Sequence, residues 1–178
     1  MLENLETIEK IEKRIEFYKK DLDLINERLE NALENIENIL VRFNTHFSDF
    51  SEQLYGEKYV FTYNKNWKNE KGSSPFTVSN MSGNPGTGKK RGQIVAFDLA
   101  YLKYLHEENI EFPRFIIHDK LENTHINQLE TIFNICNKIK GQYIVPILRE
   151  RIDKIEPALI KQATILELSQ DDKFFKID

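Results

Sequence analysis

The sequence predicts an α/β protein in which a long N-terminal coiled-coil helix precedes a compact half-domain. The first 40 residues contain neither glycine nor proline, and their apolar residues follow a seven-residue repeat. Beyond them, short apolar runs alternate with segments of helical spacing, which is typical of α/β architecture. The length of 178 residues suits one domain with an appendage. We expect the coiled coil to occupy residues 1–45 and the half-domain residues 46–178.

The N-terminal repeat has two apolar positions in every seven residues. One position holds Ile8, Ile15, Leu22, Leu29, Ile36 and Phe43, and the other holds Ile11, Tyr18, Ile25, Ala32 and Ile39. A strict seven-residue repeat keeps its apolar seam facing a partner, whereas a helix of period 3.6 lying on a domain would drift by about 20° per heptad. The repeat favours a coiled coil over a single amphipathic helix, and it implies a partner helix.

Strands and helices are expected to alternate after the coil. Alternating and aromatic segments predict strands at residues 59–63 and 75–80. Helical spacing occurs at residues 93–108 and 126–138, and a short helix is expected near Pro157. Three short apolar runs are also expected to form strands, at residues 115–117, 143–148 and 164–168. The first of them suits a buried strand of a parallel sheet.

Charge and cysteine content exclude several classes of protein. Residues 1–40 hold 11 Asp/Glu against 6 Lys/Arg, so the acidity belongs to the coil, within a net charge of −4 for the chain. A single cysteine excludes a disulfide framework and a thiolate zinc site, and it suggests a reducing compartment. No run approaches the ~20 apolar residues that cross a bilayer, and Met1–Lys10 is acidic, unlike a signal peptide. We expect a cytoplasmic protein without a membrane partner.

A glycine-rich segment, residues 82–92, precedes the predicted helix 93–108. Residues 83–90 nearly match the phosphate-binding pattern G-x-x-x-x-G-K-[S/T], in which backbone N–H groups contact phosphate and the final hydroxyl binds Mg²⁺. Lys90 stands at the hydroxyl position and cannot bind Mg²⁺. A second interpretation keeps an anion site at the start of the helix, where free N–H groups and the helix dipole favour phosphate oxygens. A third makes the segment a solvated basic connection.

A carboxylate at the end of an apolar strand is the second candidate site. The run Phe115–Ile117 is followed by His118 and Asp119, the arrangement in which a Walker B strand delivers Asp to Mg²⁺ or its water shell. Glu122 follows three residues later and is a candidate to orient or deprotonate a water. Asp119 could instead simply cap the next turn, and His118 and His125 match no strong zinc motif.

These motifs follow one another in a recognisable order, which extends over nearly the whole chain. They are Glu52–Gly56 after the coil, Gly86–Arg91 with Ala96–Leu99, Phe115–Asp119, and Ile165–Leu168 with Phe174–Phe175. The order resembles the C-terminal lobe of an SMC-like or RecN-like ATPase of the ABC class. It is particularly similar to the domain of unknown function that ends many bacterial coiled-coil ATPases of this kind.

The resemblance implies that the glycine-rich turn is a signature loop rather than a P-loop. In that family the signature loop contacts the γ-phosphate of ATP held by the Walker A motif of the opposing protomer. The residues of this chain that would then bind nucleotide are Thr87, Gly88, Lys89 and Lys90. Asp119 would be the Walker B carboxylate, catalytic and bound to Mg²⁺ through water.

The chain departs from the family pattern at three points. Lys120 stands where the catalytic glutamate usually follows the Walker B Asp, so that role passes to Glu122. The histidine expected after the next strand is missing as well, and Arg149 is the candidate to replace it at the γ-phosphate. Walker A is also missing, so the resemblance implies an N-terminal ATPase lobe or partner subunit that carries it. It further implies a helix that pairs with the coil, and a dimer.

A basic segment with interspersed aromatic residues is the candidate for nucleic-acid binding. Residues 58–92 carry seven Lys/Arg against one Glu. Such a segment can bind phosphates and stack on bases. The candidates are Lys58, Lys65, Trp67, Lys68, Lys71 and Arg91. The alternative is that the aromatic residues belong to the core and the lysines form a solubilising face.

Three hypotheses of function follow from the sequence and the resemblance. The first is the C-terminal half of a composite ATPase that requires ATP, Mg²⁺ and a partner lobe, is inactive alone, and works on DNA in repair or in defence against foreign DNA. The second is a non-enzymatic coiled-coil adaptor. The third is a self-contained, degenerate P-loop protein that uses residues 83–90.

Overall fold

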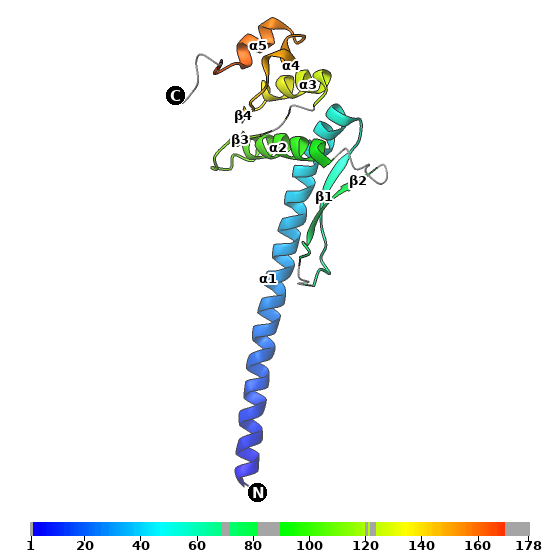
Figure 1. Ribbon diagram of the computed structural model, residues 1–178. Coiled ribbons are helices and arrows are strands. Elements are labelled where there is room, and N and C mark those ends of the chain that lie inside the picture. Colours follow the sequence, from blue (N-terminus) through cyan, green and yellow to red (C-terminus); the bar gives the residue numbers. More distant parts are fainter. Residues whose placement is uncertain (1, 69–71, 82–89, 120, 122–123, 170–178) are drawn as a thin grey trace. The chain divides into compact units, whose positions relative to one another are not determined.

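The chain is mixed α/β, with a long N-terminal helix and two small sheets (Figure 1). The computed structural model describes residues 2–68, 72–81, 90–119, 121 and 124–169, and it describes only the backbone of residues 2–5, 90 and 91. The elements are α1 (Leu2–Tyr55), β1 (Tyr59–Tyr63), β2 (Phe76–Asn80), α2 (Lys90–Glu107), β3 (Phe115–Ile117), α3 (Ile126–Cys136), β4 (Gln142–Ile144), α4 (Arg149–Ile152) and α5 (Pro157–Ala163).

Packing divides the chain into two units, and α1 contributes to both. The first unit comprises residues 1–42 and 61–77, and the second comprises residues 43–60 and 78–178. None of the described helices is both long and apolar enough to cross a membrane.

The helical part of the first unit carries the apolar seam predicted from the seven-residue repeat. Six large side chains of the seam are between 47% and 60% exposed, namely Ile8, Ile11, Ile15, Tyr18, Leu22 and Ile25. The continuous helix α1 confirms the helical prediction for this segment. The pairing of this seam with another helix stays a prediction.

Glycine ends α1 at the position where a left-handed residue is required. Gly56 has φ of +67°, and its N–H donates to the carbonyl oxygen of Glu52 at 2.8 Å. A residue without a β-carbon adopts this conformation without steric cost, which makes glycine the usual residue just after a helix. The helix therefore stops within the second unit, a few residues before β1.

The strands β1 and β2, both predicted from the sequence, form an antiparallel pair. The Asn64 N–H donates to the Pro75 carbonyl at 2.8 Å, and the Met81 N–H donates to the Lys58 carbonyl at 2.9 Å. The residue numbers of the two partners have the same sum in both hydrogen bonds, as expected for an antiparallel register. Within the first unit, the Phe61 and Phe76 rings stack at 5.3 Å.

The core of the second unit lies between the end of α1, α2 and α3. Its buried side chains include Phe43, Phe47, Phe50 and Leu54 from α1, Val95, Leu99, Leu102 and Leu105 from α2, and Leu129, Ile132 and Ile135 from α3. The Phe43 and Phe97 rings meet at 4.9 Å, and His46 Nε2 lies 2.8 Å from a Glu107 carboxylate oxygen. These contacts fix α2, which follows the glycine-rich segment, against the last turns of α1.

The second sheet is parallel, as predicted, but it is not buried. Phe115, Ile116 and Ile117 pair with Gln142, Tyr143 and Ile144, respectively. Phe115 is 52% exposed and Ile117 is 68% exposed, so the expectation of a buried strand is wrong. Among the described residues, β3 has one neighbouring strand, and no layer covers the face on which these two side chains lie.

Two predicted strand boundaries also differ from the structure. The run 143–148 is a strand only as far as Ile144, and Pro146 lies just beyond it, where the missing N–H would prevent continued pairing. The run 164–168 is not a strand, so that prediction is wrong. Its side chains Ile165, Leu166 and Leu168 are exposed, and no described strand lies beside them to complete a ladder.

Candidate functional site

The candidate site lies at the carboxyl edge of the parallel sheet β3–β4. Because the two strands are parallel, the segments that follow them leave from the same edge. Ligands of open α/β sheets bind outside the carboxyl ends of the strands. His118 and Asp119 follow β3 directly, and the His118 N–H donates to the Ile144 carbonyl at 2.9 Å, which anchors this end of β3 to β4.

A buried carboxylate from α2 holds the imidazole of His118. The Nδ1 atom of His118 lies 3.1 Å from Asp98 Oδ2, and the two side chains are only 14% and 21% exposed. Burial raises the pKa of Asp98 above its ordinary value of 3.8, and the hydrogen bond and charge of His118 lower it again in part. The carboxylate orients the ring, because a His donates from one nitrogen to the group that fixes its tautomer.

Tyr143 of β4 contacts His118 of this pair. Its ring stacks on His118 with 5.9 Å between ring centres. The Tyr143 hydroxyl is buried and has no hydrogen-bond partner among the described residues. Burial raises the pKa of Tyr143, and the nearby Asp98 raises it further. Asp98, His118 and Tyr143, the Asp–His–Tyr cluster, therefore form one largely desolvated polar group, and His118 directly precedes Asp119 in the chain.

Cys136 and Tyr55 lie near enough to Tyr143 to raise its pKa, and neither supplies a nucleophile. Burial raises the pKa of the Cys136 thiol to about 12, so the thiol stays protonated at neutral pH. Burial, together with Tyr59, raises the pKa of Tyr55 to about 12. Neither group carries charge under physiological conditions.

Asp119 is exposed at the end of β3. It has no hydrogen bond or ion pair to any described residue, so its carboxylate is open to solvent. An open carboxylate at a strand end fits Mg²⁺ chemistry, because Mg²⁺ keeps several waters and uses one or two carboxylates together with substrate phosphates. No group of three or more His, Cys, Asp or Glu residues converges on a metal position among the described side chains. Glu122 lies outside the described residues.

Most of the predicted nucleotide-binding loop lies outside the described residues. This applies to Thr87, Gly88 and Lys89, whereas Lys90 is the first residue of α2 and its side chain is not described. The described part of α2 is positioned by Gly92, which lies against the ring of Tyr55. The start of α2 is thus fixed by the last residue of α1.

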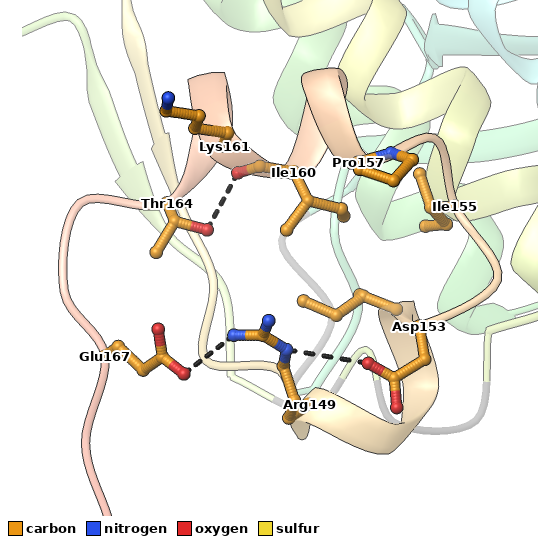
Figure 2. A pocket seen from close by; sticks show the side chains of 9 residues that line it. Arg149, Asp153, Ile155, Pro157, Ile160, Lys161, Thr164 and Glu167 are labelled. Atoms are coloured by element: carbon orange, nitrogen blue, oxygen red, sulfur yellow. Dashed lines mark hydrogen bonds and ion pairs between the residues drawn. The ribbon is translucent and has the colours of Figure 1, made fainter.

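Arg149 begins α4 and lies in a hollow of about 460 Å³ formed by α4, α5 and the segment after α5. Figure 2 shows its guanidinium between two carboxylates. The Nη1 atom lies 2.7 Å from Glu167 Oε1, and Nε lies 3.5 Å from Asp153 Oδ1. All three side chains are well exposed, and exposed ion pairs contribute only about 0–1 kcal/mol. Arg149 follows β4 by five residues, so it leaves from the same sheet edge as Asp119.

The nucleic-acid candidates are partly engaged with acidic side chains. Lys58 forms an ion pair with Glu52 at 3.2 Å, and Lys65 forms one with Glu37. The Trp67 indole N–H donates to the Ser73 hydroxyl at 2.7 Å, which keeps the ring at the surface. Lys68 is exposed. Lys71 lies outside the described residues, and the Arg91 side chain is not described.

Sequence reasoning missed the roles of Asp98 and Tyr143. Asp98 is the one charge within the apolar run Val95–Ala100 of a core helix, and such a residue is expected to have a buried partner. Nothing in the local sequence identifies that partner, because Asp98 and His118 are joined only by the packing of α2 against β3.

The fold and the cluster define a class, namely α/β proteins with a long N-terminal helix and a polar cluster at the carboxyl edge of a small parallel sheet. Residues 50–178 match the family described as an uncharacterised protein conserved in bacteria (DUF2326), and the chain belongs to this family. The match begins near the end of α1 and covers the sheets and helices that carry the site. None of the curated proteins compared with the chain matches it.

Proposed function

We propose that the chain is the C-terminal half of an SMC-like composite ATPase. It would supply a signature loop and a Walker B carboxylate to a nucleotide whose Walker A motif comes from another lobe or subunit. The assembled enzyme would bind ATP and Mg²⁺, act as a dimer, and work on DNA in repair or in defence against foreign DNA. The chain alone would be close to inactive.

The incomplete parallel sheet β3–β4 is the observation that carries the proposal. Parallel sheets occur almost only with both faces covered, and they usually contain more than two strands. Here Phe115 and Ile117 are largely exposed. Fully burying each such side chain would contribute roughly 1.5–3 kcal/mol. A second lobe that adds strands and a covering layer would bury this face. The exposed face therefore supports the proposal that the chain is one half of a larger α/β domain.

The polar groups at the sheet edge suit the chemistry of phosphoryl transfer. Bound Mg²⁺ would neutralise charge on the phosphates, and Asp119 would hold it through water. The Asp–His–Tyr cluster would keep the end of β3 fixed, because Asp98 orients His118 next to Asp119 in the chain. Glu122 would orient or deprotonate the attacking water, and Thr87, Gly88, Lys89 and Lys90 would contact the γ-phosphate.

Arg149 would reach a phosphate only after leaving its carboxylate partners. The ion pairs with Glu167 and Asp153 are exposed, so a phosphate could displace them at a cost of about 1 kcal/mol or less. This is compatible with a role at the γ-phosphate in the assembled enzyme.

A coiled-coil adaptor is the second candidate function. The exposed apolar seam of α1 favours it, because such a seam is built to bind another helix. In this case Asp119 and the Asp–His–Tyr cluster would be structural, and changing Asp119 would leave partner binding and biological activity intact.

ATP hydrolysis tests the proposal directly. The rate is measured for the chain alone and for the chain mixed with the polypeptide that carries the N-terminal lobe, sought first in the protein encoded beside it. We expect hydrolysis only in the mixture, and its loss in Asp119→Ala. The matched control is Asp23→Ala, an exposed carboxylate on α1. Hydrolysis that survives Asp119→Ala would refute the assigned role, and a mixture that binds but hydrolyses nothing would favour the adaptor.

A further inference from the structure

The seam of α1 between residues 8 and 25, here called the distal seam, is an apolar surface without a described covering layer. It consists of Ile8, Ile11, Ile15, Tyr18, Leu22 and Ile25, which lie at the two apolar positions of the repeat and are each about half exposed. They belong to one unit and one continuous helix. Their spacing of three and four residues places them on a single stripe, which is the geometry of a helix-to-helix contact.

Charged side chains flank the distal seam in an ordered pattern. Glu12 and Lys19 each come one residue after a seam residue and lie along one side of the seam. Arg14 and Asp21 each come one residue before a seam residue and lie along the other side. All four are exposed, and none forms an ion pair with another described residue. The ion pair Glu16–Lys20 at 3.0 Å uses other positions of the helix. In coiled coils, charges at these flanking positions set the partner, the orientation and the register.

We propose that the distal seam pairs with the distal seam of a second copy of the chain, in antiparallel orientation. In an antiparallel pair, a residue at the first apolar position of the repeat in one helix faces a residue at the second apolar position in the other helix. Ile15 then faces Tyr18 of the second copy, Ile11 faces Leu22, and Ile8 faces Ile25. By symmetry each of these layers occurs twice, so all six residues of the seam are covered.

The same register brings every flanking charge opposite its complement. Glu12 faces Lys19 of the second copy on one side of the seam, and Arg14 faces Asp21 on the other. Each contact also occurs twice, which gives attraction at all four flanking positions of each helix. The apolar layers fix the antiparallel pairing to within whole heptads, and the charges select this alignment among those that differ by one heptad.

Neighbouring alignments bring like charges together. A shift of one heptad in one direction places Arg14 opposite Arg14 and Glu12 opposite Glu12. A shift in the other direction places Asp21 opposite Asp21 and Lys19 opposite Lys19. A parallel pair in register places Arg14 beside Lys19 of the other helix. In parallel coiled coils, the flanking residue that precedes an apolar position contacts the flanking residue of the other helix whose number is higher by five. Like charges in such contacts are destabilising.

This inference goes beyond the proposed function, because it concerns only α1 and holds whether or not the chain hydrolyses ATP. The occupant of the distal seam is another copy of the same chain, held by self-complementary charges around a two-fold axis. The remaining seam residues of α1, from Leu29 onward, are not part of this contact.

The test is self-association of the full chain, measured by sedimentation velocity over a concentration series. We expect a dimer with a dissociation constant below about 100 µM. Glu12→Lys and Lys19→Glu each replace two attractive contacts by two repulsive ones, and each should weaken the dimer about tenfold. The double variant Glu12→Lys/Lys19→Glu restores the attraction and should return the constant to within about threefold of the original. Glu9→Lys is the control, because it makes the same charge change on the outer face and should have no effect.

The same variants distinguish the orientation. Lys19→Glu would strengthen a parallel dimer, because Arg14 would then lie beside a glutamate, so tightening in this variant refutes the antiparallel arrangement. A chain that remains monomeric throughout the series, or a double variant that does not recover, also refutes the proposal. Circular dichroism of each variant confirms that α1 is still helical, which separates a lost contact from a lost helix.

Discussion

The ring of Tyr55 lies against Gly92 so closely that a β-carbon at Gly92 would be 2.4 Å from the ring. This contact joins the last residue of α1 to the first turn of α2. No side chain fits between them, so glycine at this position allows the two helices to approach. The contact fixes the point at which the glycine-rich segment enters α2, and it gives the first prediction.

Gly92→Ala should destabilise the protein by about 1–3 kcal/mol, because the added methyl overlaps the tyrosine ring. In an ordinary helix position, replacing glycine by alanine stabilises the protein by roughly 0.5–1 kcal/mol. The sign of the change in the free energy of unfolding therefore shows whether the ring blocks the added methyl. Urea unfolding measures the effect. In a Tyr55→Ala background the ring is absent and Gly92→Ala should become neutral or stabilising. An unchanged cost in that background would contradict the contact.

Asp98→Asn should increase the free energy of unfolding most at neutral pH. The folded pKa of Asp98 is raised, so the folded state holds the proton more tightly than the unfolded state, and stability falls as pH rises from 3.8 through the raised pKa. Asparagine does not ionise, so the free energy of unfolding of the variant does not fall in this way as the pH rises. We expect its advantage over the wild type to grow between about pH 3 and about pH 7, measured by urea unfolding.

Two comparisons sharpen the Asp98 experiment. In a His118→Gln background the influence that lowers the pKa of Asp98 is removed, so the gain from Asp98→Asn at neutral pH should be larger. Asp23→Asn, on the exposed surface of α1, should show no such pH dependence. An advantage that shrinks as the pH rises would show that the hydrogen bond to His118 outweighs burial.

Tyr143→Phe should leave stability unchanged or raise it by about 1 kcal/mol. The Tyr143 hydroxyl is buried without a described partner, and a buried unsatisfied polar group costs about 1–3 kcal/mol. Thermal unfolding of the variant measures the change, with Tyr59→Phe as the control, because the Tyr59 hydroxyl donates to Glu57 at 2.6 Å. A clear loss in Tyr143→Phe would mean that the hydroxyl has a partner, such as an ordered water.

Lys65→Gln/Lys68→Gln should weaken binding to any DNA sequence and flatten its dependence on salt. Each lost phosphate contact reduces the slope of log K against log salt by about one. Because Lys65 is paired with Glu37, the variant Glu37→Gln should free the lysine and strengthen binding. Fluorescence anisotropy with a labelled duplex measures both, and Lys10→Gln on α1 is the control. An unchanged slope would assign the two lysines to the solubilising face.

Local periodicity predicted the elements that depend on local sequence. The repeat at Ile8 to Phe43 predicted the helix, and the aromatic alternation at Tyr59 to Tyr63 predicted a strand of the first sheet. The parallel character of β3 was also predicted, because its apolar run is flanked by segments of helical spacing. These features depend on the period of apolar residues, which can be read within a short window.

Features that depend on distant neighbours could not be predicted. The run 164–168 has the composition of a strand but has no described strand to pair with, and a strand requires a partner to form. The pair Asp98–His118 joins residues 20 positions apart through helix packing. Of the candidate site, the sequence therefore predicted that Asp119 follows the end of β3, and it missed the buried pairing of His118 with Asp98 and Tyr143.

The uncovered strand β3 has a consequence for how the protein is maintained in a cell. In the described part of the chain β3 pairs with one strand only, and its Phe115 and Ile117 side chains are exposed; such a strand is a template for aggregation and a target for chaperones. If another lobe completes this sheet, as proposed, a copy that lacks it would be removed faster by proteolysis than a copy in a complex, because binding stabilises the folded state by mass action. The abundance of this chain would then follow the supply of its partner, and excess copies made alone would not persist.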